Sequence, residues 1–130
     1  MKNFAKPSIL ALTLGLAICG NAMAAPSHND GTWSVRMVTD SGLCSASYNY
    51  SIAIENGNVR YLLSPGDSPT TVYGRINADG AVNLDIRRSI AKVDANGRLN
   101  GRSGAGTWRL ASFGCSGRWT AQKRSSTVSG

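Results

Sequence analysis

The chain has 130 residues, which is the length of one domain, and it carries 14 lysines and arginines against 7 aspartates and glutamates. The net charge of the whole chain is +7, and without the two lysines of its first 24 residues, 12 basic against 7 acidic residues leave +5, which favours anionic partners only weakly. His28 is the single histidine, which excludes any site that needs several imidazoles, and a metal site needs several ligands brought together.

The first 24 residues are typical of a secretory signal peptide. Lys2 and Lys6 precede an apolar run over residues 9–18, and Ala22 and Ala24 supply the small side chains of a cleavage site. The apolar run is too short to span a bilayer as a helix, and no later stretch approaches the length of about 20 residues that a span needs. We therefore expect a soluble mature chain that begins after Ala24 and is periplasmic or secreted.

The three cysteines divide between the leader and the mature chain. Cys19 offers a minor alternative, since residues 16–19 resemble a lipoprotein processing site, but Ile18 stands where a small residue is expected. Removing the leader leaves Cys44 and Cys115, and an even pair in an exported chain predicts a disulfide. A loop of about seventy residues closed in this way stabilises the fold by about 4 kcal/mol through lost chain entropy.

Residues 25–30 have the composition of a mobile arm, and a barrel-forming region is expected from residue 31 to residue 122. Residues 31–39 alternate with Trp33 inward, which predicts a strand. The next two strands place Tyr48, Tyr50 and Tyr61 inward, with Leu63 on the same side. The dipeptide at residues 56–57 is Asn-Gly, a strong signal for a two-residue hairpin turn.

A loop without any pattern follows the third strand over residues 64–71. It is the best candidate for a variable contact region, together with residues 40–45. The candidate contact residues in the first loop are Ser64, Pro65, Gly66, Asp67, Ser68 and Pro69.

Two more strands flank a turn at residues 79–80, and a third alternating run covers residues 90–100. Within this run Asn96-Gly97 is compatible with a turn or a bulge. We favour one long strand with a bulge near Gly97, because an extra turn leaves fragments too short to pair well.

The chain closes with a hairpin over residues 104–121. A four-residue loop at 111–114 sets Leu110 opposite Cys115, Trp108 opposite Gly117 and Gly106 opposite Trp119. Each indole then covers a glycine, which stabilises curved sheets. Residues 123–130 are expected to form a disordered tail.

Eight strands with short connections predict an all-β fold, a small antiparallel up-and-down barrel, with a β-sandwich as the alternative. In a closed meander the end of the first strand lies beside the start of the eighth. A disulfide between Cys44 and Cys115 would then join the first and last strands at the seam where the barrel closes.

No residues with the spacing of a catalytic, cofactor-binding or metal site are found, so an enzyme is not expected and no cofactor is assigned. Arginines project outward from most strands and form a basic outer face: Arg36, Arg60, Arg75, Arg109 and Arg118. Nucleic acid is not the expected partner, because stacking platforms need aromatic rings beside basic groups and the rings here point inward.

The interior is expected to be filled, because three tryptophans and three tyrosines point into it. The alternative is a pocket at one open end. Its rim would be formed by Tyr48, Tyr50 or Trp33, with Tyr61 beside them.

Three segments carry a resemblance to a known family. Residues 30–33, 104–108 and 115–121 resemble those of small exported bacterial proteins of unknown function, and the likeness covers nearly the whole mature chain. The resemblance implies export and a compact β-domain, with no activity. Residues 31–33 (Gly-Thr-Trp) also resemble the first-strand signature of lipocalin-type and avidin-type barrels, in which the tryptophan packs near a late arginine, here Arg118 or Arg124.

The sequence thus predicts an exported, non-enzymatic binding or interaction module whose partner it does not identify. A small-ligand-binding barrel of the lipocalin or avidin type and an inhibitor of a secreted hydrolase are the alternatives. An extracytoplasmic protein, a polysaccharide or a small apolar ligand stay open as partners.

Overall fold

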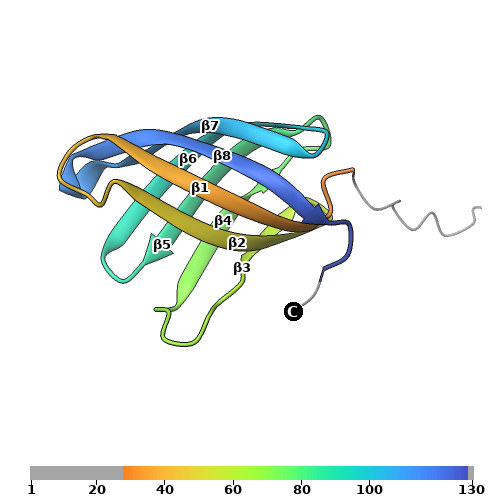
Figure 1. Ribbon diagram of the computed structural model, residues 1–130, viewed down its shortest axis with the longest axis horizontal. Coiled ribbons are helices and arrows are strands. Elements are labelled where there is room, and N and C mark those ends of the chain that lie inside the picture. The colour runs from red at the N-terminus through yellow and green to blue at the C-terminus, as the bar shows by residue number, and fades with distance from the viewer. Residues whose placement is uncertain (1–27, 129–130) are drawn as a thin grey trace, which may run out of the picture.

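The computed structural model describes residues 28–128, which form a closed antiparallel barrel of eight strands. Each strand pairs with the next, and β8 returns to pair with β1, so the predicted barrel is confirmed (Figure 1). The strands are β1 (Gly31–Ser41), β2 (Ser47–Glu55), β3 (Asn58–Tyr61), β4 (Thr70–Ile76), β5 (Ala81–Arg88), β6 (Ala91–Asn100), β7 (Ser103–Leu110) and β8 (Cys115–Ser125), with a short 3-10 turn, η1 (Ala111–Phe113), before β8. The expected signal peptide, Cys19 and residues 25–27 lie outside the described residues.

Alternation along the strands sends one set of side chains inward, as predicted. The inward set includes six aromatic residues, which all line the interior: Trp33, Tyr48, Tyr50, Tyr61, Trp108 and Trp119. The Asn-Gly turn is also confirmed, since Asn56 (φ 53°) and Gly57 (φ 83°) both adopt the left-handed backbone that this turn needs.

The closing hairpin pairs as predicted, with Leu110 opposite Cys115, Trp108 opposite Gly117, and Gly106 opposite Trp119. The long sixth strand is confirmed as well, but it holds neither a turn nor a bulge at Gly97. β6 keeps an unbroken register with both neighbours, with Gly97 directly opposite Gly106. A Cβ atom on either glycine would come within 2.7 Å of the Trp119 ring. The glycine at residue 97 therefore makes room for an indole and does not bend the strand.

The disulfide joins Cys44, in the loop after β1, to Cys115 at the start of β8, with 6.1 Å between their Cα atoms. It lies at the β1–β8 seam, where the predicted disulfide was placed. The outer side of this seam carries a bidentate pair in which Arg118 donates to both oxygens of Asp40 at 2.8 Å.

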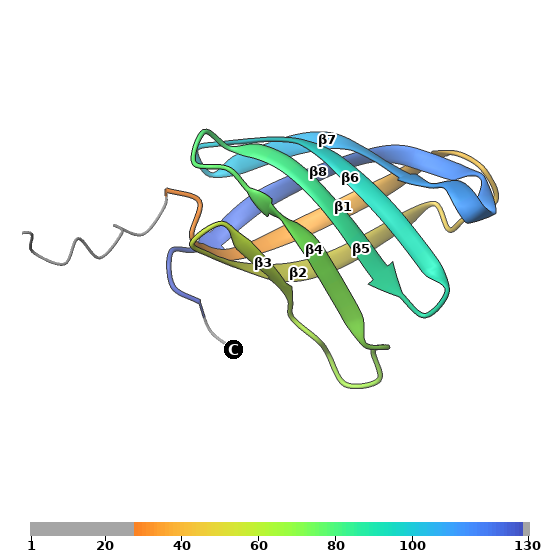
Figure 2. The same cartoon turned by 180° about the vertical axis from the view of Figure 1, so that it is seen from behind.

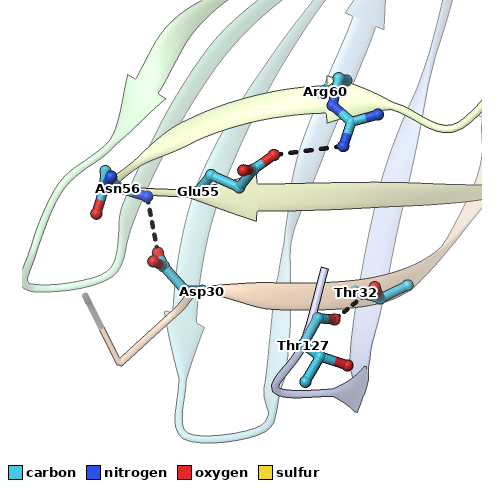
Figure 3. A network of polar contacts seen from close by, with 6 residues as sticks. All are labelled: Asp30, Thr32, Glu55, Asn56, Arg60 and Thr127. Carbon is cyan, nitrogen blue, oxygen red and sulfur yellow. Dashed lines mark hydrogen bonds and ion pairs between the residues drawn. The ribbon is translucent and has the colours of Figure 1, made fainter. Parts of the chain in front are cut away.

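The opposite end of the barrel, where both ends of the described part of the chain lie, is covered by residues that were expected to be mobile (Figure 1). Asn29 is buried, and its carbonyl oxygen accepts a hydrogen bond from the Trp33 indole at 2.8 Å. Asp30 accepts a hydrogen bond from the Asn56 amide at 2.9 Å, and Thr32 donates to the Thr127 carbonyl at the same distance (Figure 3). β8 also continues to Ser125, beyond the expected domain end at residue 122. Residues 28–30 and 123–125 therefore belong to the barrel, because the first three make hydrogen bonds to it and the last three continue β8.

β3 is short and barely joined to β4. Within residues 28–128 the two strands share one ladder pair, Asn58 with Arg75, near the end that residues 28–30 cover. Towards the disulfide end the two strands diverge, and the loop of residues 62–69 that connects them extends beyond their ends (Figure 2). Leu63, predicted to point inward on the third strand, lies in this loop with 58% of its surface exposed. The Leu62 amide still bonds the Ser51 carbonyl of β2, and beyond it the chain turns into the loop, where the Tyr61 hydroxyl and the Ser64 amide bond the Asp67 carboxylate.

Candidate ligand cavity

The barrel interior is not completely filled, contrary to the expectation of a solid core. It encloses a cavity of about 280 Å³ whose walls are almost entirely apolar, with residues from all eight strands. The aromatic rings and large aliphatic chains do line the interior, but they leave a space along the axis. Ala95, one of the lining residues, supplies little side-chain volume.

The cavity is closed at one end and reachable at the other. Lining residues near the chain termini are buried, among them Trp33, Ile54 and Leu99, which are 0–5% exposed. Lining residues near the disulfide end and the gap between β3 and β4 are partly exposed, among them Thr70 and Val72. We call this second opening the mouth of the cavity.

Three tyrosines line the mouth, at the positions predicted for a pocket rim. The Tyr48 and Tyr50 rings are stacked with centroids 6.2 Å apart, and the Tyr61 ring meets the Tyr50 ring edge-on at 5.6 Å. Tyr48 accepts a hydrogen bond from the Ser45 amide, and Tyr61 donates one to Asp67. Among the described residues the Tyr50 hydroxyl makes no hydrogen bond, and burial raises its pKa, so the hydroxyl stays neutral.

Among the described residues that line the cavity, Arg88 is the one that carries a charge. It is the last residue of β5, at the mouth, and its guanidinium lies over the rings of Tyr61 (5.1 Å) and Tyr50 (5.7 Å). Its Nε donates to the Thr70 hydroxyl at 2.8 Å. Its Nη2 is buried and has no hydrogen-bond partner within residues 28–128.

Sequence reasoning did not single out Arg88. The signal for it was present, because the alternation that turns Val82, Leu84 and Ile86 inward continues to residue 88. An arginine at a core position of a strand breaks the apolar pattern, and such breaks concentrate at functional sites.

The loop of residues 62–69 is held by Asp67. Its carboxylate accepts hydrogen bonds from the Ser64 amide at 2.8 Å and the Tyr61 hydroxyl at 3.0 Å, and these bonds hold the pKa of Asp67 below its usual range. The remaining candidate contact residues in the loop are exposed: Ser64, Pro65, Gly66, Ser68 and Pro69. This loop therefore packs against the mouth through Asp67 and presents its other residues to solvent.

Each of the four loops at the disulfide end carries one exposed large apolar side chain. We call this set the apolar rim, and it consists of Leu43 (102% exposed), Leu63 (58%), Ile90 (83%) and Phe113 (51%). The loops at the other end, residues 56–57, 77–80 and 101–102, hold no large apolar residue. These four loop residues therefore all lie at the disulfide end of the barrel.

The five arginines of the predicted basic face are exposed, as expected, but they do not form one patch. They come from five different strands around the barrel: Arg36 from β1, Arg60 from β3, Arg75 from β4, Arg109 from β7 and Arg118 from β8. Arg60 pairs with Glu55 at 3.3 Å (Figure 3). Arg75 donates to the Asn56 carbonyl, and Arg118 pairs with Asp40. Arg124 donates to Ser34 on the outside of the barrel, so neither late arginine contacts the Trp33 indole through a hydrogen bond.

Between residues 28 and 128 no group of three or more histidine, cysteine, aspartate or glutamate side chains is arranged to hold a metal ion. In the same part of the chain, no helix is long and apolar enough to cross a membrane. Comparison with protein-family models and with curated proteins finds no match for this chain. The cavity, its mouth and the apolar rim are therefore the candidate functional features of the described chain.

Proposed function

We propose that this protein is an exported, non-enzymatic barrel that binds a small apolar ligand in its interior. The observation that carries the proposal is the cavity of about 280 Å³, closed at one end and lined by apolar side chains. Binding sites for small molecules are concave, mostly apolar and supplied with a few polar groups that orient the ligand. Tyr50 and Arg88 at the mouth are such groups.

The cavity volume limits the size of the ligand. An apolar cavity of about 150 Å³ takes up one benzene molecule. The present cavity is roughly twice as large, which suits a ligand of about ten non-hydrogen atoms. A slender chain fits better than a fused ring system, because the lining residues run from the mouth to the closed end.

Export is supported by two observations of different kinds. The disulfide between Cys44 and Cys115 is a bond that persists in oxidising compartments. The first 24 residues have the charge, apolar run and small residues of a bacterial secretory signal. Together they support the proposal of a periplasmic or secreted location.

The proposal is tested by titrating the oxidised protein with 1-octanol and following amide chemical shifts by NMR. In the Ala95→Leu variant the added side chain lies in the cavity, whereas Ala105→Leu makes the same change on the outer face of β7. Saturable binding to the wild type and to Ala105→Leu, with at least tenfold weaker binding to Ala95→Leu, is the expected result. Equal binding to both variants would show that octanol does not enter the barrel.

The apolar rim favours a second candidate, an interaction module that docks on another exported protein through the disulfide end. An inhibitor of a secreted hydrolase would use the rim and the exposed residues of loop 62–69 in this way. In that case a Leu43→Ser/Ile90→Ser variant would lose the partner, while octanol binding in the cavity would not depend on those two residues.

A further inference from the structure

The guanidinium of Arg88 is a charge in an otherwise apolar wall, and its charge is incompletely balanced. An arginine side chain stays protonated at all ordinary pH values, and a partly buried charge is unfavourable unless it is paired and hydrogen-bonded. Here the partners are one hydroxyl, from Thr70, and the faces of two rings, while Nη2 is buried without a hydrogen bond among residues 28–128.

Asp67 is a carboxylate whose charge interacts with that of Arg88, but its hydrogen bonds go to other residues. The same oxygen, Oδ2, accepts from both the Ser64 amide and the Tyr61 hydroxyl. The ion pairs within 4 Å among residues 28–128 do not include one between Asp67 and Arg88. The positive charge of Arg88 contributes only the smallest of the effects that lower the pKa of Asp67. The guanidinium therefore keeps the capacity to bind an anion.

A hydrogen-bond donor stands beside this charge. The Tyr50 ring lies against the Arg88 guanidinium, and its neutral hydroxyl makes no hydrogen bond in residues 28–128. A carboxylate accepts two N–H bonds from one guanidinium and has lone pairs left for a hydroxyl. Arg88 and Tyr50 together match that pattern at the mouth of an apolar cavity.

We propose that the ligand of this barrel is an anionic amphiphile, a short aliphatic chain ending in a carboxylate, with its chain in the cavity and its carboxylate on Arg88 and Tyr50. This inference rests on the proposed function and adds the chemical class of the ligand. Since Nη2 is covered in the free protein, binding includes a shift of the side chain of Arg88 or of one of its two tyrosines.

The experiment compares octanoate with 1-octanol, which have the same chain and differ in the charge of the head group. Both are titrated at pH 7, where a carboxyl group with a pKa near 4.3 is ionised. The variants are Arg88→Met, which keeps most of the side-chain length without the charge, and Arg88→Lys, which keeps the charge without the planar fork. Arg87→Met is the matched control, because Arg87 neighbours Arg88 but is exposed on the outer face beside Asp85.

For the wild type and Arg87→Met we expect octanoate to bind at least tenfold more tightly than octanol. In Arg88→Met the affinities for octanoate and octanol become equal, because only octanoate binding weakens. In Arg88→Lys the ratio of the two affinities lies between the wild-type ratio and that of Arg88→Met. Equal affinities for the two ligands in the wild type, or an octanoate preference that survives Arg88→Met, would overturn the inference while leaving an apolar binding site in place. No binding of octanol at all would instead contradict the proposed function itself. An unfolding midpoint for each variant shows whether it is folded.

Discussion

Trp119 lies inside the barrel because the residues around it have no side chains to exclude it. A Cβ atom on Gly97 would lie 2.6 Å from the ring carbon Cζ2, and one on Gly106 would lie 2.7 Å from Cε2. The indole nitrogen of the same ring donates to the Asn96 carbonyl at 3.1 Å. This hydrogen bond fixes the orientation of the ring in the space that the two glycines leave. A wide ring between two glycine backbones is a specific arrangement with little freedom to shift.

Replacing Gly106 by alanine is therefore expected to destabilise the barrel. The added methyl group would clash with both the Trp119 ring and the backbone of β6, and overpacking of this kind costs about 1–3 kcal/mol. The control is Thr107→Ala, next to it on the exposed outer face of β7, which should change the free energy of unfolding by less than about 0.5 kcal/mol. Urea unfolding measures the free energy of unfolding of both variants. Equal changes in the two variants would show that Gly106 is not needed to accommodate the Trp119 ring.

At the scale of residues, the sequence predicts which residues pair across the closing hairpin, but it does not predict the role of Gly97. The pairing of Trp108 with Gly117 and of Gly106 with Trp119 follows from counting back from a four-residue loop, since register determines it. The role of Gly97 does not follow in the same way, because the ring that it accommodates comes from a strand two positions away in the sheet.

The hairpin of β2 and β3 shows what can be predicted at the scale of elements. Its turn follows from Asn56 and Gly57 alone, because few dipeptides tolerate positive φ at both positions. The end of β3 does not follow from the pattern, which continues inward to Leu63. The strand ends after Tyr61 because side-chain bonds to Asp67 take the chain into its loop.

Asp67 links the stability of this loop to pH. Its pKa is lowered in the folded protein, so its contribution to stability is complete above its ordinary pKa of about 3.9 and is lost as the pH falls through the lowered value. The Asp67→Asn variant lacks this contribution. We expect the difference in urea midpoint between wild type and Asp67→Asn to be constant from pH 6 to 5 and to shrink below about pH 4. A difference that stays the same down to pH 2.5 would show that the carboxylate does not hold the loop.

At the scale of the whole molecule, two features of the barrel have different origins in the sequence. The closure of the barrel was predictable from two features of the sequence. Eight alternating segments predict eight strands, and the two cysteines lie just after the first strand and at the start of the eighth, so a disulfide between them places these strands side by side. The cavity was not predictable by counting aromatic side chains. Whether a barrel is hollow depends on its radius, and the radius depends on strand stagger and tilt, which residue volumes do not reveal.

The two ends of the barrel differ in a way that supports one direction of binding. The end near the chain termini is covered by Asn29 and has polar turns, whereas the disulfide end has the apolar rim, the diverging strands β3 and β4, and Arg88. A ligand would therefore pass the rim, place its chain inward and leave its polar group at the mouth.

The central claim is that a ligand occupies the interior, and the most direct measurement is an isotope-filtered NOE experiment on the protein saturated with octanoate. We predict contacts from the terminal methyl group of octanoate to buried lining residues near the closed end, such as Val82 and Leu99. Contacts restricted to the apolar rim residues Leu43 and Ile90, with none to the buried lining, would contradict the account and assign binding to the outer surface.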